Sequence, residues 1–404
     1  MSKAYNYDII IIGGGIGGAA LGGMLASHGI QVLILEREKS FRDRVRGEYM
    51  HPWGVAEAKA IGLYELLKKT CGYETRFRVN RVAGLPPSPA RDLVNTTPHK
   101  VGSLHFYHPE MQEVVLNAAT DAGATVQRGV PAVDLIQKPN LAVRIQPNGS
   151  EQVYSARLIV GADGRASACR KWGNFSVQRD PDRMIIAGVL LDHLNAPEDA
   201  VYIYIDPPRS QFAFTVPLGG KRFRCYAGFY QQTGRHRLSS AKDISAFINA
   251  SISSGMPAEW FTEAEIAGPL ASFDCADTWV PHPYRERIAL LGDAAAASDP
   301  SFGCGLSLVL RDVRVLSNLL VNESDWDAAA HMYAEEHDRY FGSLHRLLDW
   351  MTKLFYEPGS SAEVRRARAF ERIVEDPKRV PDLAGLGPES PSDEAAYRNL
   401  FGED

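Results

Sequence analysis

The sequence predicts an α/β protein with a discontinuous Rossmann-like domain, an inserted antiparallel β-sheet domain and a helical C-terminal segment. Three observations predict this fold. A glycine-rich strand–turn–helix unit opens the chain, two later buried-strand patterns each run into a Gly/Asp turn, and short β-branched or aromatic segments lie between those two patterns. The 404 residues are enough for two or three packed lobes.

The first unit spans residues 7–36. Residues 8–12 are an apolar run of the kind that a buried parallel strand needs, and residues 13–18 fit G-x-G-x-x-G. A helix is expected over 19–27 and a second strand over 31–35, which ends at Glu36. The glycine motif alone is weak evidence, but with both strands, the helix and the acid it strongly favours nucleotide binding.

Each part of this unit has a physical task. Gly13 allows a tight turn, Gly15 lets the backbone approach a pyrophosphate, and Gly18 lets helix and strand pack closely. Gly17 is a further candidate for cofactor binding. A pyrophosphate is stabilised at the helix N-terminus by free N–H groups and the helix dipole. Glu36 can accept hydrogen bonds from ribose hydroxyls. The unit therefore predicts a cofactor that contains ADP, the alternative being a glycine-rich turn of an ordinary α/β domain.

Two further strands end in acidic turns. The buried-strand pattern at 158–160 runs into Asp163-Gly164, and the pattern at 288–291 runs into a Gly-Asp pair that ends at Asp293. Asp163-Gly164 alone would indicate a surface turn, but a buried strand precedes it. A long apolar helix is expected from Leu306, and its approach contains the further candidates Pro300, Gly303 and Gly305.

These three motifs, in this order and at about these spacings, resemble the FAD-dependent aromatic hydroxylase family, single-component flavoprotein monooxygenases like para-hydroxybenzoate hydroxylase. The resemblance covers roughly residues 7–325. It implies one non-covalent FAD and a transient NADPH or NADH. It also implies that Asp293 bonds a ribityl or ribose hydroxyl, that Asp163 serves both FAD and NAD(P)H, and that the helix start faces the flavin pyrimidine ring.

The chain departs from the family pattern at three positions. Ala296 stands where a His is frequent, Ser307 where an Asn is frequent, and His108 where an Arg is frequent, whereas the FAD-contacting Gln112 is kept. These departures leave FAD binding intact and put close substrate analogies in doubt.

The loop after Glu36 supplies further candidates by resemblance. Arg46 would pair with the pyrophosphate and Arg37 would lie along the adenine; a solvated basic loop is the alternative for both. His51 is a weak candidate for an acid or base, and a structural, hydrogen-bonded histidine is the better interpretation.

Four short segments with turn residues between them predict an antiparallel sheet, which in the family roofs the substrate pocket: 185–191, 201–205, 212–216 and 224–229. Gly219-Gly220 is typical of a hairpin turn. Strand alternation puts Tyr202 with Tyr204 on one face and Phe212 with Phe214 on one face, without deciding which face meets the flavin. The candidate substrate contacts are Trp53, Tyr202, Tyr204, Phe212 and Phe214.

We expect the following division of the chain: an FAD-binding domain of residues 1–75, 101–180 and 278–325; a substrate domain of residues 76–100 and 181–277; and a C-terminal helical segment, 326–404. The last stretch, 382–404, is rich in Pro, Gly, Ser and acids and is expected to be loosely ordered.

Composition excludes several classes of protein. The net charge of −5 and the lack of a basic block argue against nucleic-acid binding. The longest apolar runs are too short for a transmembrane helix, and the polar start leaves no room for a signal peptide. Five scattered cysteines without C-x-x-C indicate reduced thiols, a cytoplasmic enzyme and no metal site.

The sequence therefore favours an oxidoreductase: an FAD-dependent monooxygenase that uses NAD(P)H and O₂ to hydroxylate or epoxidise a small substrate, with an aromatic one preferred. By resemblance, oxygen is delivered through a flavin C4a-hydroperoxide. Alternatives are a reductase or oxidase, or a halogenase, on the same scaffold; the halogenase signature G-W-x-W-x-I-P is missing. An FAD-binding sensor has no positive feature. The sequence leaves open the substrate, NADH or NADPH, a catalytic base, and monomer or homodimer.

Overall fold

The computed structural model describes residues 5–45, 47–231 and 237–403. Its first sheet has the strand order β20 (Tyr284–Arg285), β21 (Ile288–Leu290), β11 (Gln152–Gly161), β1 (Tyr7–Ile12), β2 (Val32–Glu36) and β8 (Thr125–Arg128). The strands from β21 to β8 run parallel. Antiparallel β10 (Ala142–Ile145) and β9 (Ala132–Ile136) extend β11. The predicted Rossmann-like α/β fold is confirmed.

The isoleucine run of β1 explains why this strand is central. All four isoleucines of residues 9–12 are buried, and alternate ones point to opposite faces of the sheet. Ile9 and Ile11 pack in the larger hydrophobic core with helix α1 (Ile16–Ser27), whereas Ile10 and Ile12 pack in a second core that includes residues of β9 and β10. A strand covered on both faces needs a continuous apolar run, which is what the sequence provides.

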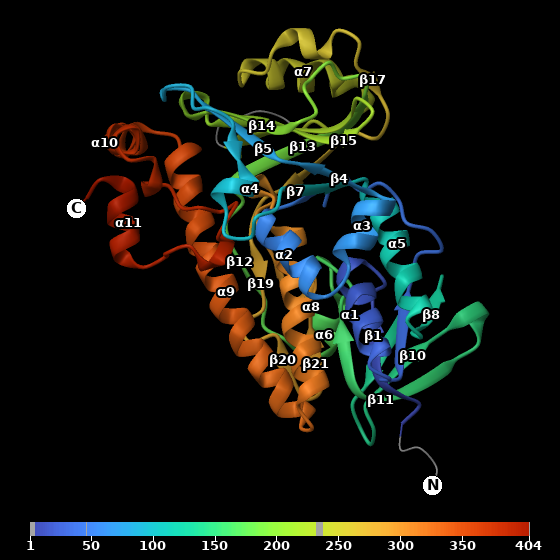
Figure 1. Ribbon diagram of the computed structural model, residues 1–404. Coiled ribbons are helices and arrows are strands. Elements are labelled where there is room, and N and C mark those ends of the chain that lie inside the picture. The colour runs from blue at the N-terminus through green and yellow to red at the C-terminus, as the bar shows by residue number, and fades with distance from the viewer. Residues whose placement is uncertain (1–4, 46, 232–236, 404) are drawn as a thin grey trace.

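Two more helices cover the α1 face. Helices α5 (His108–Asp121) and α8 (Gly305–Asn322) both pack against α1 (Figure 1). Both helices come from sequence far beyond the glycine turn, so distant segments meet on this face of the first sheet.

The second sheet has the order β17 (Glu265–Ile266), β13 (Met184–Asp192), β16 (Arg222–Tyr230), β15 (Gln211–Gly219), β14 (Ala200–Asp206), β5 (Phe77–Val82) and β6 (Arg91–Asp92), with β18 (Ala271–Asp274) also paired to β13. The four predicted strands β13 to β16 are antiparallel, and the Gly219-Gly220 turn joins β15 to β16. The sheet is not purely antiparallel, because β5 pairs with β14 in parallel. Helix α7 (Ile244–Ser253) covers the outer face (Figure 1).

Smaller elements join the two sheets. One three-stranded sheet contains β3 (Tyr49–Met50), β7 (Ser103–Phe106) and β4 (Gly72–Thr75), and another contains β12 (Gln178–Arg179), β19 (Thr278–Trp279) and β22 (Ala296–Ala297). The remaining short helices are α2 (Pro52–Ala60), α3 (Tyr64–Thr70), α4 (Leu93–Thr96) and α6 (Ala168–Trp172).

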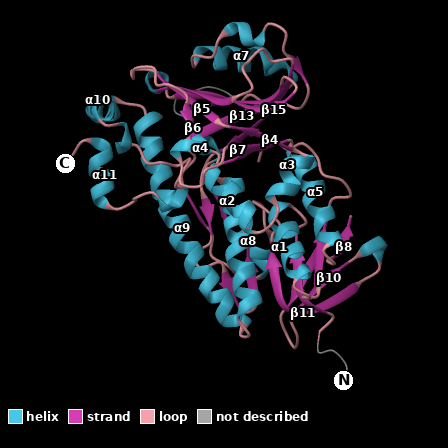
Figure 2. Ribbon diagram, in the orientation of Figure 1, coloured by secondary structure: helices cyan, strands magenta, loops and turns pink. Residues whose placement is uncertain are grey.

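The C-terminal segment is helical, as predicted, with α9 (Trp326–Phe355), α10 (Ser360–Glu375) and α11 (Glu394–Phe401). Figure 2 shows α9 alongside α8, with α10 and α11 beyond it. Residues 382–403 are not loosely ordered, contrary to expectation. Phe401 is 0% exposed, Asp382 is paired with Arg91 at 2.6 Å, and the indole of Trp53 donates to the Leu383 carbonyl at 3.1 Å. The polar composition of this stretch concealed its few apolar anchors.

No helix among the described residues has a stretch that is both long enough and apolar enough to cross a bilayer.

The packed tail gives a direct test. Phe401→Ala should lower the free energy of unfolding by about 3–5 kcal/mol, because it removes a fully buried ring. Val364→Ala on α10 is the control, since Val364 is 69% exposed and its loss should change stability by less than about 0.5 kcal/mol. Chemical denaturation measures both. Equal, small effects would mean that the tail is not part of the folded core.

Candidate flavin site

One cavity of about 710 Å³ reaches from the glycine turn after β1 to the inner face of β15 and β16. The predicted cofactor residues that line it are Gly13, Gly15, Gly17, Glu36, Arg37, Gln112, Asp163, Gly164, Asp293, Pro300, Gly303, Gly305 and Leu306. Gly18 is not in the lining, and Arg46 lies outside the described residues. Three motifs that are far apart in sequence therefore meet around one space.

The glycine turn is shaped by backbone contacts. Gly13 has a φ of +108°, and a Cβ there would lie 2.3 Å from the Ala162 carbonyl oxygen. A Cβ on Gly18 would lie 2.0 Å from the Gly13 oxygen, so Gly18 serves close packing behind the cavity. Helix α1 begins just after Gly15, which has no side chain to cap it. The first N–H groups of the helix are thus available to a pyrophosphate.

Glu36 does more than its predicted task. It is 7% exposed, and its Oε2 accepts a hydrogen bond from the Gly14 N–H at 2.7 Å while its Oε1 accepts from the Glu38 N–H at 2.8 Å. The carboxylate therefore fixes the glycine turn. Each oxygen has a second lone pair, so ribose hydroxyls can still be accepted. Arg37 is exposed and lies 3.6 Å from Glu38 at the same end of the cavity.

Asp163 lines the cavity, and one of its carboxylate oxygens has no hydrogen-bond partner in the described part of the chain. Its Oδ2 accepts from the N–H groups of Ala168 and Cys169, at 2.7 and 3.2 Å, and so caps α6. Its Oδ1 is buried and has no hydrogen-bond partner among the described residues. Ser298 also belongs to the lining, and its buried hydroxyl likewise has no hydrogen-bond partner among the described residues. Buried polar atoms need partners, and the hydroxyl-rich chain of FAD offers them.

Arg170 had no predicted role, yet its side chain holds two motifs together. Its guanidinium donates to the carbonyl oxygens of Asp293 at 2.6 Å and Ala294 at 2.7 Å, and also to that of Arg165 at 3.1 Å. Arg170 follows the Asp163 turn, so it fixes the Asp293 turn relative to it. The spacing of Arg170 from Asp163 was visible in the sequence, but its partners were not.

The approach to α8 forms the far end of the cavity. Asp299 caps a short 3₁₀ turn, Pro300–Phe302, and Gly303 follows with a φ of +69°. Helix α8 then begins at Gly305, one residue before the predicted start. A helix N-terminus facing the cavity stabilises negative charge there.

The predicted substrate residues divide between two faces of the second sheet. Phe214 lines the cavity, and Phe212 stacks beside it with ring centroids 5.9 Å apart. Tyr202 and Tyr204 point to the opposite face, where they pack against Trp260 at 5.2 and 6.0 Å. Both tyrosines are therefore absent from the cavity wall. The face of the second sheet that meets the cavity is the one that carries Phe214. Trp53 is likewise absent from the lining, because its ring anchors the C-terminal tail.

His51 supports the segment that precedes helix α8, Pro300–Phe302, and does not line the cavity. It is 1% exposed, and its Nε2 lies 2.9 Å from the Phe302 carbonyl oxygen. Burial, with the nearby Arg78 charge, lowers the pKa of His51 to about 3, so the ring is neutral near pH 7. Its position matches a structural histidine.

Glu48 and Tyr226 are among the lining residues that the sequence analysis missed. The Tyr226 hydroxyl donates to Oε2 of Glu48, and Arg224 lies 3.2 Å from Oε1. Burial raises the pKa of Glu48, while Arg224 and the hydrogen bond from Tyr226 favour its ionised form. Burial and Glu48 hold the pKa of Tyr226 well above its usual range, so the phenol keeps its proton. No motif signals this pair, because the two residues come from different domains.

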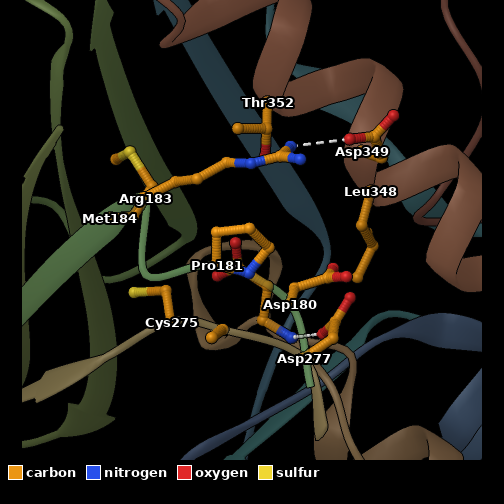
Figure 3. A pocket seen from close by; sticks show the side chains of 11 residues that line it. Asp180, Pro181, Arg183, Met184, Cys275, Asp277, Leu348, Asp349 and Thr352 are labelled. Carbon is orange, nitrogen blue, oxygen red and sulfur yellow. Dashed lines mark hydrogen bonds and ion pairs between the residues drawn. The ribbon is translucent and has the colours of Figure 1, made fainter. Parts of the chain in front are cut away.

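A second cavity, of about 30 Å³, lies behind the loop and has room for about one water molecule (Figure 3). Burial raises the pKa of Asp277 there to about 8 and that of Asp299 to about 6. His345 lies 2.8 Å from Asp180 and 3.7 Å from Asp277. The cluster of Asp180, Asp277 and His345 borders the turn that Asp299 caps, and the small cavity is separate from the larger one.

Comparison with known proteins identifies the family. A family model described as an FAD binding domain matches residues 6–338. A rifampicin monooxygenase of Streptomyces venezuelae is 26% identical over 383 residues, which cover 91% of this chain and 76% of that protein. A digeranylgeranylglycerophospholipid reductase of Methanococcoides burtonii is 24% identical over 74% of this chain and 71% of its own length.

Solved structures agree on the fold. The p-nitrophenol 4-monooxygenase of Pseudomonas putida superposes with a TM-score of 0.75 at 15% identity, covering 92% of this chain and 94% of that one. A mutant of the flavin-dependent brominase Bmp2 superposes with a TM-score of 0.76 at 15% identity, covering 98% of this chain and 99% of that one.

The chain belongs to the FAD binding domain family and, within it, to the FAD-dependent aromatic hydroxylases. It is an enzyme, a flavoprotein of the monooxygenase type.

The loop glycine gives a test with a matched control. Gly303→Ala and Gly29→Ala both place a side chain at positive φ, +69° and +78°, and each should lose about 1–3 kcal/mol of stability. A Cβ at Gly303 would lie 2.9 Å from Tyr49, in the cavity wall, whereas the space around Gly29 is open. Gly303→Ala alone should therefore weaken FAD binding, by about tenfold. Thermal melting and FAD titration measure the two effects; equal FAD affinities would contradict the placement of the flavin at this loop.

Proposed function

We propose that this enzyme uses NADPH or NADH and O₂ to hydroxylate or epoxidise a small aromatic substrate, with one non-covalent FAD in the large cavity. The observation that carries the proposal is the continuity of that cavity. One space joins the nucleotide-binding turn at Gly13 to the aromatic inner face of the second sheet at Phe214. An enzyme that oxygenates a separate substrate needs both ends in one continuous space.

The residues fit FAD along the length of the cavity. Glu36 and Arg37 would take the adenosine end, and the N-terminus of α1 would take the pyrophosphate. Asp293 and the free Oδ1 of Asp163 would hold hydroxyl groups, with Asp163 also serving the visiting NAD(P)H. The loop from Pro300 to Leu306 would then face the flavin ring, with Gln112 beside the glycine turn.

Bound FAD would supply the redox chemistry, accepting a hydride from NAD(P)H and passing one oxygen atom of O₂ to the substrate. The side chains would position the ligands and exclude water. Phe214, Phe273 and Tyr226 form an aromatic wall at the end of the cavity where the flavin ring would lie, and this wall limits the access of water. The N-terminus of α8 stabilises negative charge at the ring edge. Among the predicted residues we assign no covalent catalyst.

Two rival activities share this scaffold. A reductase or oxidase fits the matching digeranylgeranylglycerophospholipid reductases, and a halogenase fits the similarity of the fold to a brominase. Oxygenation is preferred because the chain has no halogenase signature and its relatives include a 6-methylpretetramide 4-monooxygenase of Streptomyces rimosus, 23% identical over 76% of this chain.

The remaining proposals concern the setting of the enzyme. All five cysteines are free thiols, which supports the predicted reducing, cytoplasmic environment.

The decisive assay follows oxygen into product. The FAD-loaded enzyme is screened for aromatic compounds that accelerate NAD(P)H oxidation, and turnover with the best one is repeated in labelled O₂. The product should carry one labelled atom.

Asp163→Ala should bind FAD more than tenfold more weakly, because it loses hydrogen bonds worth about 1.5–3 kcal/mol, and its FAD should be reduced slowly by NAD(P)H. Asp121→Ala, at an exposed position, is the control.

Two outcomes would contradict the proposal. One is product oxygen that comes only from water. The other is consumption of NAD(P)H that yields peroxide and no oxygenated product with every compound tested, which would favour the oxidase or reductase alternative.

A further inference from the structure

The turn that carries Asp293 is held in place by side chains that do not line the large cavity. Gly292 and Asp293 line it, whereas Asp312 on α8 and Tyr340 on α9 do not. Gly292 has a φ of +61°, a conformation that favours glycine, and it is buried. The position of Asp293 therefore depends on contacts that lie outside the cavity.

Asp312 is the direct support of this turn. It is fully buried, and its Oδ2 accepts a hydrogen bond from the Gly292 N–H at 2.8 Å. Its Oδ1 accepts a hydrogen bond from the Tyr340 hydroxyl. Each carboxylate oxygen thus has a partner, and the two hydrogen bonds fix the carboxylate between the turn and helix α9.

The charge of Asp312 makes these hydrogen bonds important. Burial raises the pKa of Asp312, whereas the positive charge of a protonated His337 and the hydrogen bonds from Tyr340 and Gly292 lower it. His337 is also fully buried, and neither of its ring nitrogens has a hydrogen-bond partner in the part of the chain that the structure describes. A buried carboxylate is destabilising unless it is hydrogen-bonded or paired, so loss of either donor would disturb this carboxylate.

Helix α9 presents one face to the turn. Tyr333, His337 and Tyr340 have the spacing i, i+4, i+7, so their side chains share a face of the helix. The Tyr333 hydroxyl donates to the Leu290 carbonyl at 2.8 Å, at the end of β21 that leads into the turn. The helical C-terminal segment thus supports a cofactor motif, although Tyr340 lies beyond the family match at residues 6–338.

The turn is therefore held by a donor and by an acceptor from different parts of the chain. Arg170 donates to the carbonyl oxygens of Asp293 and Ala294, and Asp312 accepts from the Gly292 N–H. Without the Asp312 carboxylate, the buried Gly292 N–H would have no acceptor unless the turn moved. A displaced turn would no longer hold Asp293 where it now lines the cavity.

We propose that Asp312 and Tyr340 are positioning residues for FAD. Tyr340 orients the Asp312 carboxylate, this carboxylate holds the turn at Gly292, and the turn presents Asp293 to a hydroxyl group of the cofactor. The inference rests on the proposed placement of FAD in the large cavity, and it makes α9 a part of the cofactor site. The apparent Kd for FAD rises as the fraction of molecules with a correctly placed turn falls.

Release of FAD from the full-length, FAD-loaded enzyme measures this role without NAD(P)H or substrate. The enzyme is diluted in steps well below its melting temperature, and the fluorescence of the released flavin gives the Kd. Asp312→Leu has a similar branched shape but leaves the Gly292 N–H unpaired, so the Kd should rise about tenfold or more. Asp312→Asn can still accept from that N–H, so its Kd should lie within about threefold of the wild-type value.

Tyr340→Phe separates positioning from folding, and it carries the test alone if Asp312→Leu does not fold. It removes only the hydroxyl that orients Asp312, so the Kd should rise about threefold or more. Tyr284→Phe on β20 is the matched control, because the Tyr284 hydroxyl also donates to a carboxylate, that of Asp327 at 2.5 Å. Chemical denaturation should show similar losses of stability for both variants, but only Tyr340→Phe should release FAD more readily.

A double-mutant cycle tests whether these residues act through Asp293. Asp293→Ala should itself weaken FAD binding by more than about tenfold, and adding Asp312→Leu or Tyr340→Phe should change the Kd by less than about twofold. Losses that multiply in full, wild-type Kd values in both Asp312→Leu and Tyr340→Phe, or an equal loss in Tyr284→Phe would overturn the positioning role alone. Wild-type affinity in Asp293→Ala would instead refute the placement of FAD at this turn, on which the proposed function also rests.

Discussion

The close approach of the Gly13 turn to the Ala162 carbonyl is the contact on which the site depends. The Gly13 N–H donates to the Leu35 carbonyl and the Ala162 N–H donates to the Ile12 carbonyl, both at 2.8 Å. The ends of three parallel strands are thereby joined through backbone alone. Only glycine fits at position 13, because any Cβ would overlap the carbonyl. Glu36 and Asp163 take their places as the next residues along two of these strands.

The rest of the site follows from this edge. Ligands of open α/β sheets bind at the carboxyl ends of the strands, and here the third motif reaches the same edge through β21 and the Arg170 contacts. The second sheet then closes the far end of the cavity with one of its two faces. The order of the strands in the first sheet therefore determines where the flavin cavity lies. The face of the second sheet that points into the cavity determines which side chains, such as Phe214 and Tyr226, would meet a substrate.

The sequence was a good guide where local rules decide. A glycine turn, a buried strand and a terminal acid are all local, so Gly13, Glu36, Asp163 and Asp293 could be placed before the structure was known. Tertiary packing decided the rest. Alternation paired Phe212 with Phe214 but could not orient the sheet, and Glu48 meets Tyr226 across 178 residues of sequence. The polar tail misled because a few anchors such as Phe401 outweigh its composition.

A crystal structure of the enzyme with bound FAD would show whether the large cavity is the flavin site. We expect the pyrophosphate at the N-terminus of α1, a hydroxyl group of FAD within hydrogen-bond distance of Oδ1 of Asp163, and the flavin ring between the Gly303 loop and Phe214. A flavin bound elsewhere, or a ring that leaves Asp163 Oδ1 unpartnered and does not reach Phe214, would contradict it.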